Sequence, residues 1–236
     1  MKTYKVNFIP PIAEPILYLV AFGFGLGLFV EDIEGIPYPK FIAPALLAIS
    51  MMYAGFFECT YSSFVRMYYQ KTFDAIVATP LNIDEVITGE ILWGATRSAI
   101  YGSIVLVVVS AFGLVSLPAA LLVIPFSFLV GFLFGSIGMC FTAIAPHIDT
   151  LSYPTSLFIT PMLLISGTFF PITAFPVVVQ QIATVSLPLV HVVEILRAIT
   201  YGELEWGLLL NLAWILIVTV VVFIAAVNLM KKRLVV

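Results

Sequence analysis

Charged residues are scarce in this chain: only 10% of its 236 residues are Asp, Glu, Lys or Arg, whereas 62% are hydrophobic. Soluble domains typically contain about 25% charged and about 45–50% apolar residues. The polar side chains are too few to cover the surface of a soluble fold. We therefore predict an all-α polytopic membrane protein in contact with membrane lipid. The formal net charge is only −3, and no long basic run is present, which argues against nucleic acid as a partner.

Residues that carry chemistry are equally few. The two cysteines, Cys59 and Cys140, fall in apolar stretches, where a thiol usually acts as a small hydrophobe. The two histidines, His147 and His191, are predicted below to lie on opposite sides of the membrane, so they cannot share a metal. The sequence contains no G-x-x-x-x-G-K-[ST], H-E-x-x-H or C-x-x-C motif. We therefore expect no catalytic residue, cofactor or metal in this chain.

Long apolar runs account for most of the sequence. A helix needs about 20 apolar residues to cross the ~30 Å of hydrocarbon in a bilayer. Six stretches meet this requirement in a single transmembrane domain over residues 1–236: Ile12–Val30, Phe41–Val65, Leu92–Phe112, Ala119–Ile144, Leu151–Phe170 and Gly207–Leu229.

The distribution of basic residues predicts the orientation of these spans. Cytoplasmic loops carry an excess of Lys and Arg. By this topology only Lys40 and Arg197 fall on the outer side, so we predict a multi-pass protein of the cell (cytoplasmic or inner) membrane with both termini in the cytoplasm. The basic residues on the cytoplasmic side are Lys2, Lys5, Arg66, Lys71, Lys231, Lys232 and Arg233.

The segment Arg66–Glu90 is a long, densely charged break between apolar runs. We predict a short helix from Tyr69 to Ala78 that ends before Thr79-Pro80, because a residue before proline avoids the helical region. Asn82 with Glu85 predicts a capping box at the start of a second short helix. The segment is either a solvated loop or a lever gripped by a cytosolic protein. The lever hypothesis assigns ATPase coupling to Arg66, Lys71, Asp74, Pro80, Asn82, Asp84 and Glu85.

Two charges are predicted to lie inside the membrane. Glu58 lies about 10 Å inside the second span and Arg97 about 8 Å inside the third, by the helical rise per residue. Their similar depth on antiparallel neighbours predicts a Glu58–Arg97 pair. Alternatively, Arg97 snorkels to headgroups or Glu58 lines a transport path. The glycines of 23–27 and 131–138 are interpreted as patches where helices approach closely.

Residues 171–206 are too apolar for an ordinary loop and too interrupted by proline to span. Apolar stretches of roughly 10–14 residues are more often interfacial or re-entrant than transmembrane. His191, Glu194 and Arg197 share one helix face by their spacing, which places Glu194 and Arg197 next to each other. We hypothesise a re-entrant helical hairpin at the outer mouth; a purely anchoring interfacial helix pair is the alternative. The candidate outer gate comprises Phe169, Phe170, Pro171, Gln180, Glu194 and Arg197.

Four stretches, in order along the chain, resemble the ABC-2-type transporter permeases, with the NodJ-like lipooligosaccharide exporters as the nearest branch. They are EPILYLVAFGFGLG, FFECTYSSFVRMYYQKTFDAIVATPLNIDEVITGEILWGATRS, APHIDTLSYPTSLFITPMLLISGTFFPI and LPLVHVVEILRAITYG.

The resemblance implies a coupling helix within Arg66–Glu90 that docks on an ATP-binding-cassette ATPase subunit. It also implies a homodimer of permeases, ATP and Mg bound by the partner subunits, and an amphiphilic cargo such as a lipid-linked oligosaccharide or polysaccharide. Members usually begin with a longer amphipathic helix, whereas this chain offers only MKTYKVNFIPP. Open alternatives are a drug, antibiotic or haem exporter of the same class, an intramembrane lipid-modifying enzyme, and a secondary transporter, although the internal repeat often found in the latter is absent.

Overall fold

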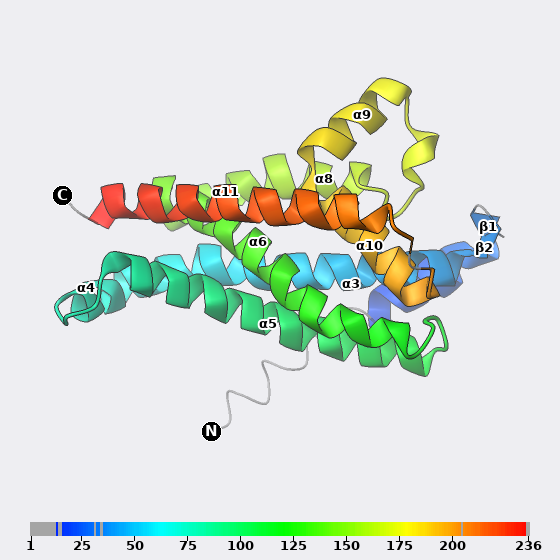
Figure 1. Ribbon diagram of the computed structural model, residues 1–236, viewed down its shortest axis with the longest axis horizontal. Coiled ribbons are helices and arrows are strands. Elements are labelled where there is room, and N and C mark those ends of the chain that lie inside the picture. The colour runs from blue at the N-terminus through cyan, green and yellow to red at the C-terminus, as the bar shows by residue number, and fades with distance from the viewer. Residues whose placement is uncertain (1–12, 14–15, 31, 34, 204, 235–236) are drawn as a thin grey trace.

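The structure is a computed structural model that describes residues 13, 16–30, 32–33, 35–203 and 205–234. The side chains of Phe24, Asp74 and Val77 also lie outside this description. Long helices run side by side along the molecule, and a pair of very short strands lies at one end (Figure 1). The all-α class predicted from the composition is confirmed.

Five helices among the described residues are long and apolar enough to cross a membrane: Tyr38–Tyr69, Ile83–Ala111, Ala119–Ile144, Ile148–Ile165 and Leu208–Leu234. The first consists of α3 (Tyr38–Phe57), η3 (Glu58–Ser62) and η4 (Val65–Tyr69), and the second is α5 (Ile83–Ala111). The third joins η5 (Ala119–Leu122) to α6 (Val123–Ile144). The fourth is built from η6 (Ile148–Leu151), α7 (Ser152–Pro154), η7 (Thr155–Ile159) and α8 (Thr160–Ile165), and the fifth is α11 (Leu208–Leu234).

The first predicted span, Ile12–Val30, begins in residues that the structure does not describe. Its described part is a shorter apolar helix, Ile16–Leu28, which includes η1 (Leu19–Gly25) and η2 (Leu26–Leu28). The strands β1 (Asp32–Ile33) and β2 (Ile36–Pro37) pair antiparallel directly after it.

The segment before the last span forms two helices, as predicted, after the short η8 (Ile172–Ala174). They are α9 (Val177–Ser186) and α10 (Pro188–Tyr201), which meet at an angle of 90°. The bend falls at Leu187, whose extended backbone precedes Pro188, as expected for a residue before proline. Taken as one broken span, this pair would raise the number of candidate spans in the described residues to six.

The boundaries of the middle spans differ from the prediction. The third span was expected to begin at Leu92 after a separate short helix, but α5 runs without interruption from Ile83. No proline lies between Asn82 and Leu92, so nothing stops the helix once it is capped. The short helix expected from Tyr69 instead begins at Thr72, as α4 (Thr72–Val77), because Lys71 adopts a positive φ of 54°.

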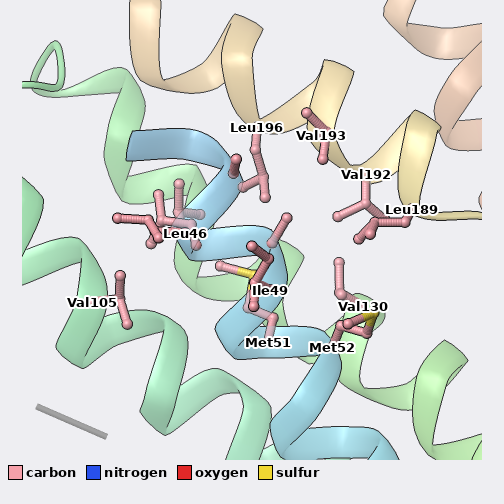
Figure 2. Packing of buried hydrophobic residues seen from close by; sticks show 14 of the residues in the cluster. Leu46, Ile49, Met51, Met52, Val105, Val130, Leu189, Val192, Val193 and Leu196 are labelled. Atoms are coloured by element: carbon pink, nitrogen blue, oxygen red, sulfur yellow. The ribbon is translucent and has the colours of Figure 1, made fainter. Parts of the chain in front are cut away.

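The hydrophobic core surrounds α3, which lies between α5, α6 and α10 (Figure 2). Leu47, Met51 and Met52 of α3 are completely buried. By contrast, α11 packs on α6 and leaves large apolar side chains such as Leu210 and Ile217 exposed. In a membrane protein such an apolar outer face suits contact with lipid.

Small residues allow α3, α5 and α6 to approach closely, as predicted for the glycines at 131–138. A Cβ atom added to Gly55 of α3 would lie 2.6 Å from the carbonyl oxygen of Gly131, and one added to Gly138 would lie 2.8 Å from that of Phe56. Gly94 is equally restricted, because its Cβ would lie 2.8 Å from Cys59 Sγ. The three helices therefore form a tightly packed unit that cannot slide without opening these contacts.

Candidate functional site: the coupling end and its charge cluster

The predicted coupling segment and the last turn of α11 lie at the same end of the bundle, and the β1–β2 hairpin lies at the opposite end (Figure 1). An ion pair joins the two elements, because Lys231 Nζ of α11 lies 2.7 Å from Asp84 Oδ2 of α5. At this end a second apolar cluster includes Phe73 of α4 and Met230 of α11, both fully buried. The short helix α4 therefore packs against the spans through the buried side chain of Phe73.

The capping box predicted at the start of α5 is confirmed. Asn82 caps the N3 amide, and the side chain of Glu85 accepts a 2.8 Å hydrogen bond from the Asn82 amide. The tip of the segment around Pro80 and Asn82 is exposed. Lys71 is also exposed and its Nζ lies 5.6 Å from the centroid of the Tyr68 ring. The side chain of Asp74 lies outside the described atoms.

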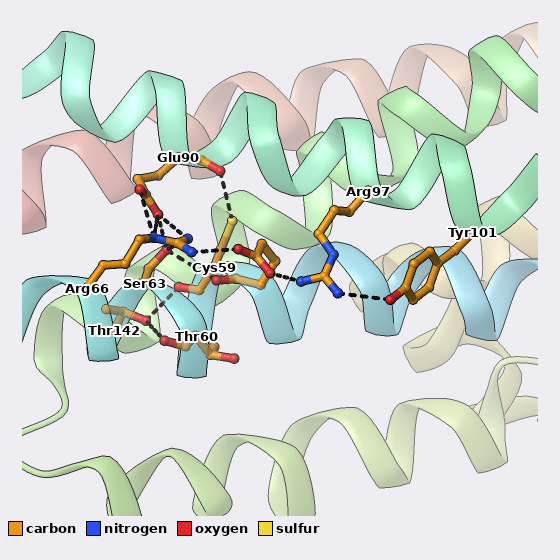
Figure 3. A network of polar contacts seen from close by, with 9 residues as sticks. Cys59, Thr60, Ser63, Arg66, Glu90, Arg97, Tyr101 and Thr142 are labelled. Atoms are coloured by element: carbon orange, nitrogen blue, oxygen red, sulfur yellow. Dashed lines mark hydrogen bonds and ion pairs between the residues drawn. The ribbon is translucent and has the colours of Figure 1, made fainter. Parts of the chain in front are cut away.

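A cluster of four charged side chains joins α5 to the tail of α3 (Figure 3). Glu58, whose side chain is only 2% exposed, pairs with Arg66 Nη1 at 2.8 Å and with Arg97 Nη1. The structure thus brings Glu58 and Arg97 together. Arg66 also donates from Nε to both carboxylate oxygens of Glu90 at 3.0 Å. Two guanidinium groups and two carboxylates share one partly buried site.

Neutral groups complete the hydrogen bonding of this charge cluster, which we define as Glu58, Arg66, Glu90 and Arg97. Ser63 donates to Glu90 at 2.5 Å, and Arg97 Nη2 donates to the Tyr101 hydroxyl at 2.9 Å. Burying charges is tolerable only when they are paired and hydrogen-bonded in this way. The cluster therefore favours one relative position of α3 and α5.

The backbone of α3 is adapted to hold the cluster. Glu58 lies in the π-helical stretch η3 and Arg66 in the π-helical stretch η4. π-Helical stretches within α-helices occur frequently at functional sites. The Cys59 carbonyl in η3 accepts a 2.7 Å hydrogen bond from Thr142 Oγ1. Thus α6 satisfies a backbone group beside the charges.

The candidate outer gate residues lie toward the other end of the molecule, and the contacts described for them go to different partners. The ring of Phe169 lies 5.4 Å from that of Phe22, whereas Phe170 is 56% exposed and Pro171 half-buried. Gln180 Nε2 donates a 2.7 Å hydrogen bond to the Phe175 carbonyl. Arg197 donates to the Gly167 carbonyl, with its guanidinium 4.0 Å from the Phe41 ring centroid.

Glu194 connects α10 to the last span, where it accepts a 2.7 Å hydrogen bond from Asn211 Nδ2. His191 contacts the same asparagine through Nδ1 at 2.9 Å and stacks on Trp214. These contacts fix α10 against α11. Neither Asn211 nor Trp214 was predicted, because nothing in the sequence indicates which residues of the next helix lie opposite α10.

Comparison with known proteins agrees with this architecture. The sequence profile of the ABC-2 type transporter family matches residues 1–201. The chain belongs to the ABC-2 type transporter family. It is therefore a membrane transport permease, and the predicted resemblance is confirmed. No solved structure shows a significant match.

Full-length relatives support the same assignment. Nodulation protein J of Sinorhizobium fredii is 34% identical over 233 residues, which cover 99% of this chain and 88% of the relative. Nodulation protein J of Rhizobium leguminosarum bv. viciae is 35% identical over the same length, with 99% and 90% covered. The inner membrane transport permease YadH of Escherichia coli is 24% identical over 204 residues, with 86% and 78% covered.

Glu90 belongs to the charge cluster and Tyr101 accepts a hydrogen bond from it, but neither was among the predicted site residues. Glu90 was assigned to a water-exposed segment, whereas its side chain is only 15% exposed. The sequence does hold a signal for it: Glu90 and Arg97 are seven residues apart, which places them on one face of a continuous helix. Because α5 is one continuous helix over both residues, this spacing indicates that Glu90 and Arg97 lie on the same side of it.

Proposed function

We propose that this chain is the membrane-spanning subunit of an exporter driven by a separate ATP-binding-cassette ATPase. Two copies of the permease and two ATPase subunits, which bind ATP and Mg, move an amphiphilic cargo outward across the cell membrane. Both termini and the coupling segment face the cytoplasm, in accordance with the distribution of Lys and Arg. The proposed cargo class, a lipid-linked oligosaccharide or polysaccharide, rests on the similarity to lipooligosaccharide exporters.

The observation that carries this proposal is the construction of the coupling segment. Its underside is buried through Phe73, while its outer surface exposes Tyr68, Tyr69 and Leu81, which are 48%, 60% and 49% exposed. Exposed aromatic and apolar side chains of this kind, at and just after the end of a span, are typical of the core of a protein–protein interface. One side of the coupling segment thus packs on the spans, and its opposite, exposed side is available to a partner protein.

The charge cluster supplies the connection from this docking surface to the spans. The segment joins α3, through its tail η4, to α5, and the cluster holds these two helices together immediately inside the membrane. The close packing at Gly55 and Gly131 then adds α6 to the same unit. A displacement of α4 should therefore move the spans that contain α3, α5 and α6 together.

Co-purification tests the docking surface. The permease with Leu81→Asp should lose the ATPase that co-purifies with the unchanged protein, because a carboxylate would be placed in an apolar contact. Leu117→Asp is the matched control, since Leu117 is 64% exposed and lies in the connection between α5 and α6 at the far end of the bundle. Equal retention of the ATPase by both variants would rule out this docking surface.

Stimulation of ATP hydrolysis tests the cargo class. The reconstituted complex is supplied with a lipid-linked oligosaccharide, a hydrophobic drug or antibiotic, or haem, and the rate of ATP hydrolysis is measured. We expect stimulation by the lipid-linked oligosaccharide. Stimulation by a drug, antibiotic or haem alone would assign this permease to the alternative cargo class while leaving its coupling to the ATPase intact.

A further inference from the structure

The last turn of α11 contains three consecutive basic residues, Lys231, Lys232 and Arg233. Such residues at the end of a span are commonly explained by orientation in the membrane alone. Lys232 is exposed to solvent and fits that explanation. The side chains on either side of it are directed to particular partners in the bundle.

Arg233 binds the end of α6. Its Nη1 lies 2.7 Å from the carbonyl oxygen of Ala145 and 3.2 Å from that of Ala143, and it also donates to the Thr142 carbonyl. The last carbonyls of a helix have no intrahelical partners, and a cation there interacts favourably with the helix dipole. The guanidinium group also lies 5.5 Å from the centroid of the Phe64 ring on the tail of α3.

Lys231 binds the start of α5. Its ammonium group pairs with Asp84, a residue in the first turn of that helix, at 2.7 Å. The two side chains are 45% and 46% exposed, so this pair is weaker than the contacts of Arg233. Together with the buried Met230, the last turn of α11 contacts the tail of α3, the start of α5 and the end of α6, at the same end of the bundle as α4.

We propose that Lys231 and Arg233 are positioning residues that hold the coupling segment in register with the last span and α6. This inference rests on the proposed function and deepens it. The ATPase docks on the exposed surface of the segment, and the last turn of α11 determines how far the displacement of that surface reaches the spans. Loss of this turn should uncouple ATP hydrolysis from export without removing the ATPase.

Hydrogen exchange on the purified permease tests the positioning role without the ATPase. Arg233→Gln should accelerate amide exchange in α4 and in the last turn of α6 by about tenfold or more, because charge-assisted hydrogen bonds are lost. Lys232→Gln, which removes the same charge one residue away, should leave both regions unchanged. Equal acceleration in both variants, or no acceleration in Arg233→Gln, would overturn the proposal.

Export per ATP hydrolysed tests the consequence in the assembled complex. We expect Lys231→Asp to lower this ratio by about two- to fivefold, and Asp84→Lys combined with Lys231→Asp to restore it. Retention of the ATPase by Lys231→Asp and by Arg233→Gln supports the proposal. Failure of the charge reversal to restore coupling, or loss of the ATPase from Arg233→Gln, would contradict it. Failure of the unchanged permease to capture any ATPase would instead refute the proposed function, and hydrogen exchange would still decide the role of the turn.

Discussion

Neutralising Glu58 is the sharpest test of the charge cluster. This carboxylate is almost fully buried and serves Arg66 and Arg97 at once, so Glu58→Gln leaves two guanidinium groups with only Glu90 as a counter-charge. Breaking a buried ion pair by removing one partner typically destabilises by about 3–5 kcal/mol. The arginine side chains are 24% and 34% exposed and can recover some hydration. We therefore expect Glu58→Gln to lower the free energy of unfolding by about 3 kcal/mol, the lower end of that range.

The charge balance predicts how the changes in unfolding free energy of the Glu58 and Arg97 variants combine. Arg97→Gln alone leaves Glu58 paired with Arg66, and the combined Glu58→Gln and Arg97→Gln variant restores neutrality through Arg66 and Glu90. The double variant should therefore be more stable than the sum of the single losses predicts, by about 0.5–3 kcal/mol, which is the usual range for residues in one network.

Unfolding in mixed micelles with increasing SDS measures the free energies, and export assays on the same variants measure activity. Glu205→Gln provides the matched control, because Glu205 is exposed and surface substitutions usually stay within about 0.5 kcal/mol. Additive losses of stability and of transport in the double variant would refute the idea that Glu58 and Arg97 act as a pair.

Three further variants test other parts of the structure. Gly55→Ala should destabilise the protein by about 1–3 kcal/mol through overpacking against the Gly131 carbonyl. The control is Gly89→Ala in α5, where nothing lies within 4 Å of the added Cβ, and this change should be neutral or stabilise the protein by about 0.5–1 kcal/mol. Equal unfolding midpoints for the two variants would contradict the close approach of α3 and α6. Asn82→Ala should lower stability by about 0.5–2 kcal/mol by removing the cap of α5, and an unchanged denaturation curve would speak against that role. A cysteine at Ile182 of α9 should be protected from membrane-impermeant thiol reagents if the hairpin is re-entrant, and complete labelling would exclude that arrangement.

Several local features could be predicted from local patterns in the sequence. Asn82 and Glu85 lie in the same helical turn, so the capping box could be inferred from their spacing alone. The Glu58–Arg97 contact required only a depth estimate on two adjacent spans. The interruption of residues 171–206 by proline was also predicted, and the structure places a bend at Leu187, directly before Pro188, where proline restricts the backbone of the preceding residue.

Partners on different helices could not be inferred in the same way. Gly55 is restricted by Gly131 on another helix, and the sequence does not give the rotation of one helix against the next. Asn211 was missed for the same reason, since only the packing of α10 on α11 places it beside His191 and Glu194. Glu90 could not be predicted for a related reason, since a third span that begins at Leu92 places Glu90 in water and leaves Arg66 without it as a partner.

The charge cluster also bears on the electrical properties of transport. Moving one elementary charge across the full membrane potential involves about 2.3 kcal/mol per 100 mV. The cluster carries two positive and two negative groups that are bound to one another, so the cluster itself contributes no net charge when α3 and α5 move together. The contribution of the cluster to the transport cycle should therefore be insensitive to voltage, and an effect of an ionophore on export per ATP would have to come from charges outside the cluster.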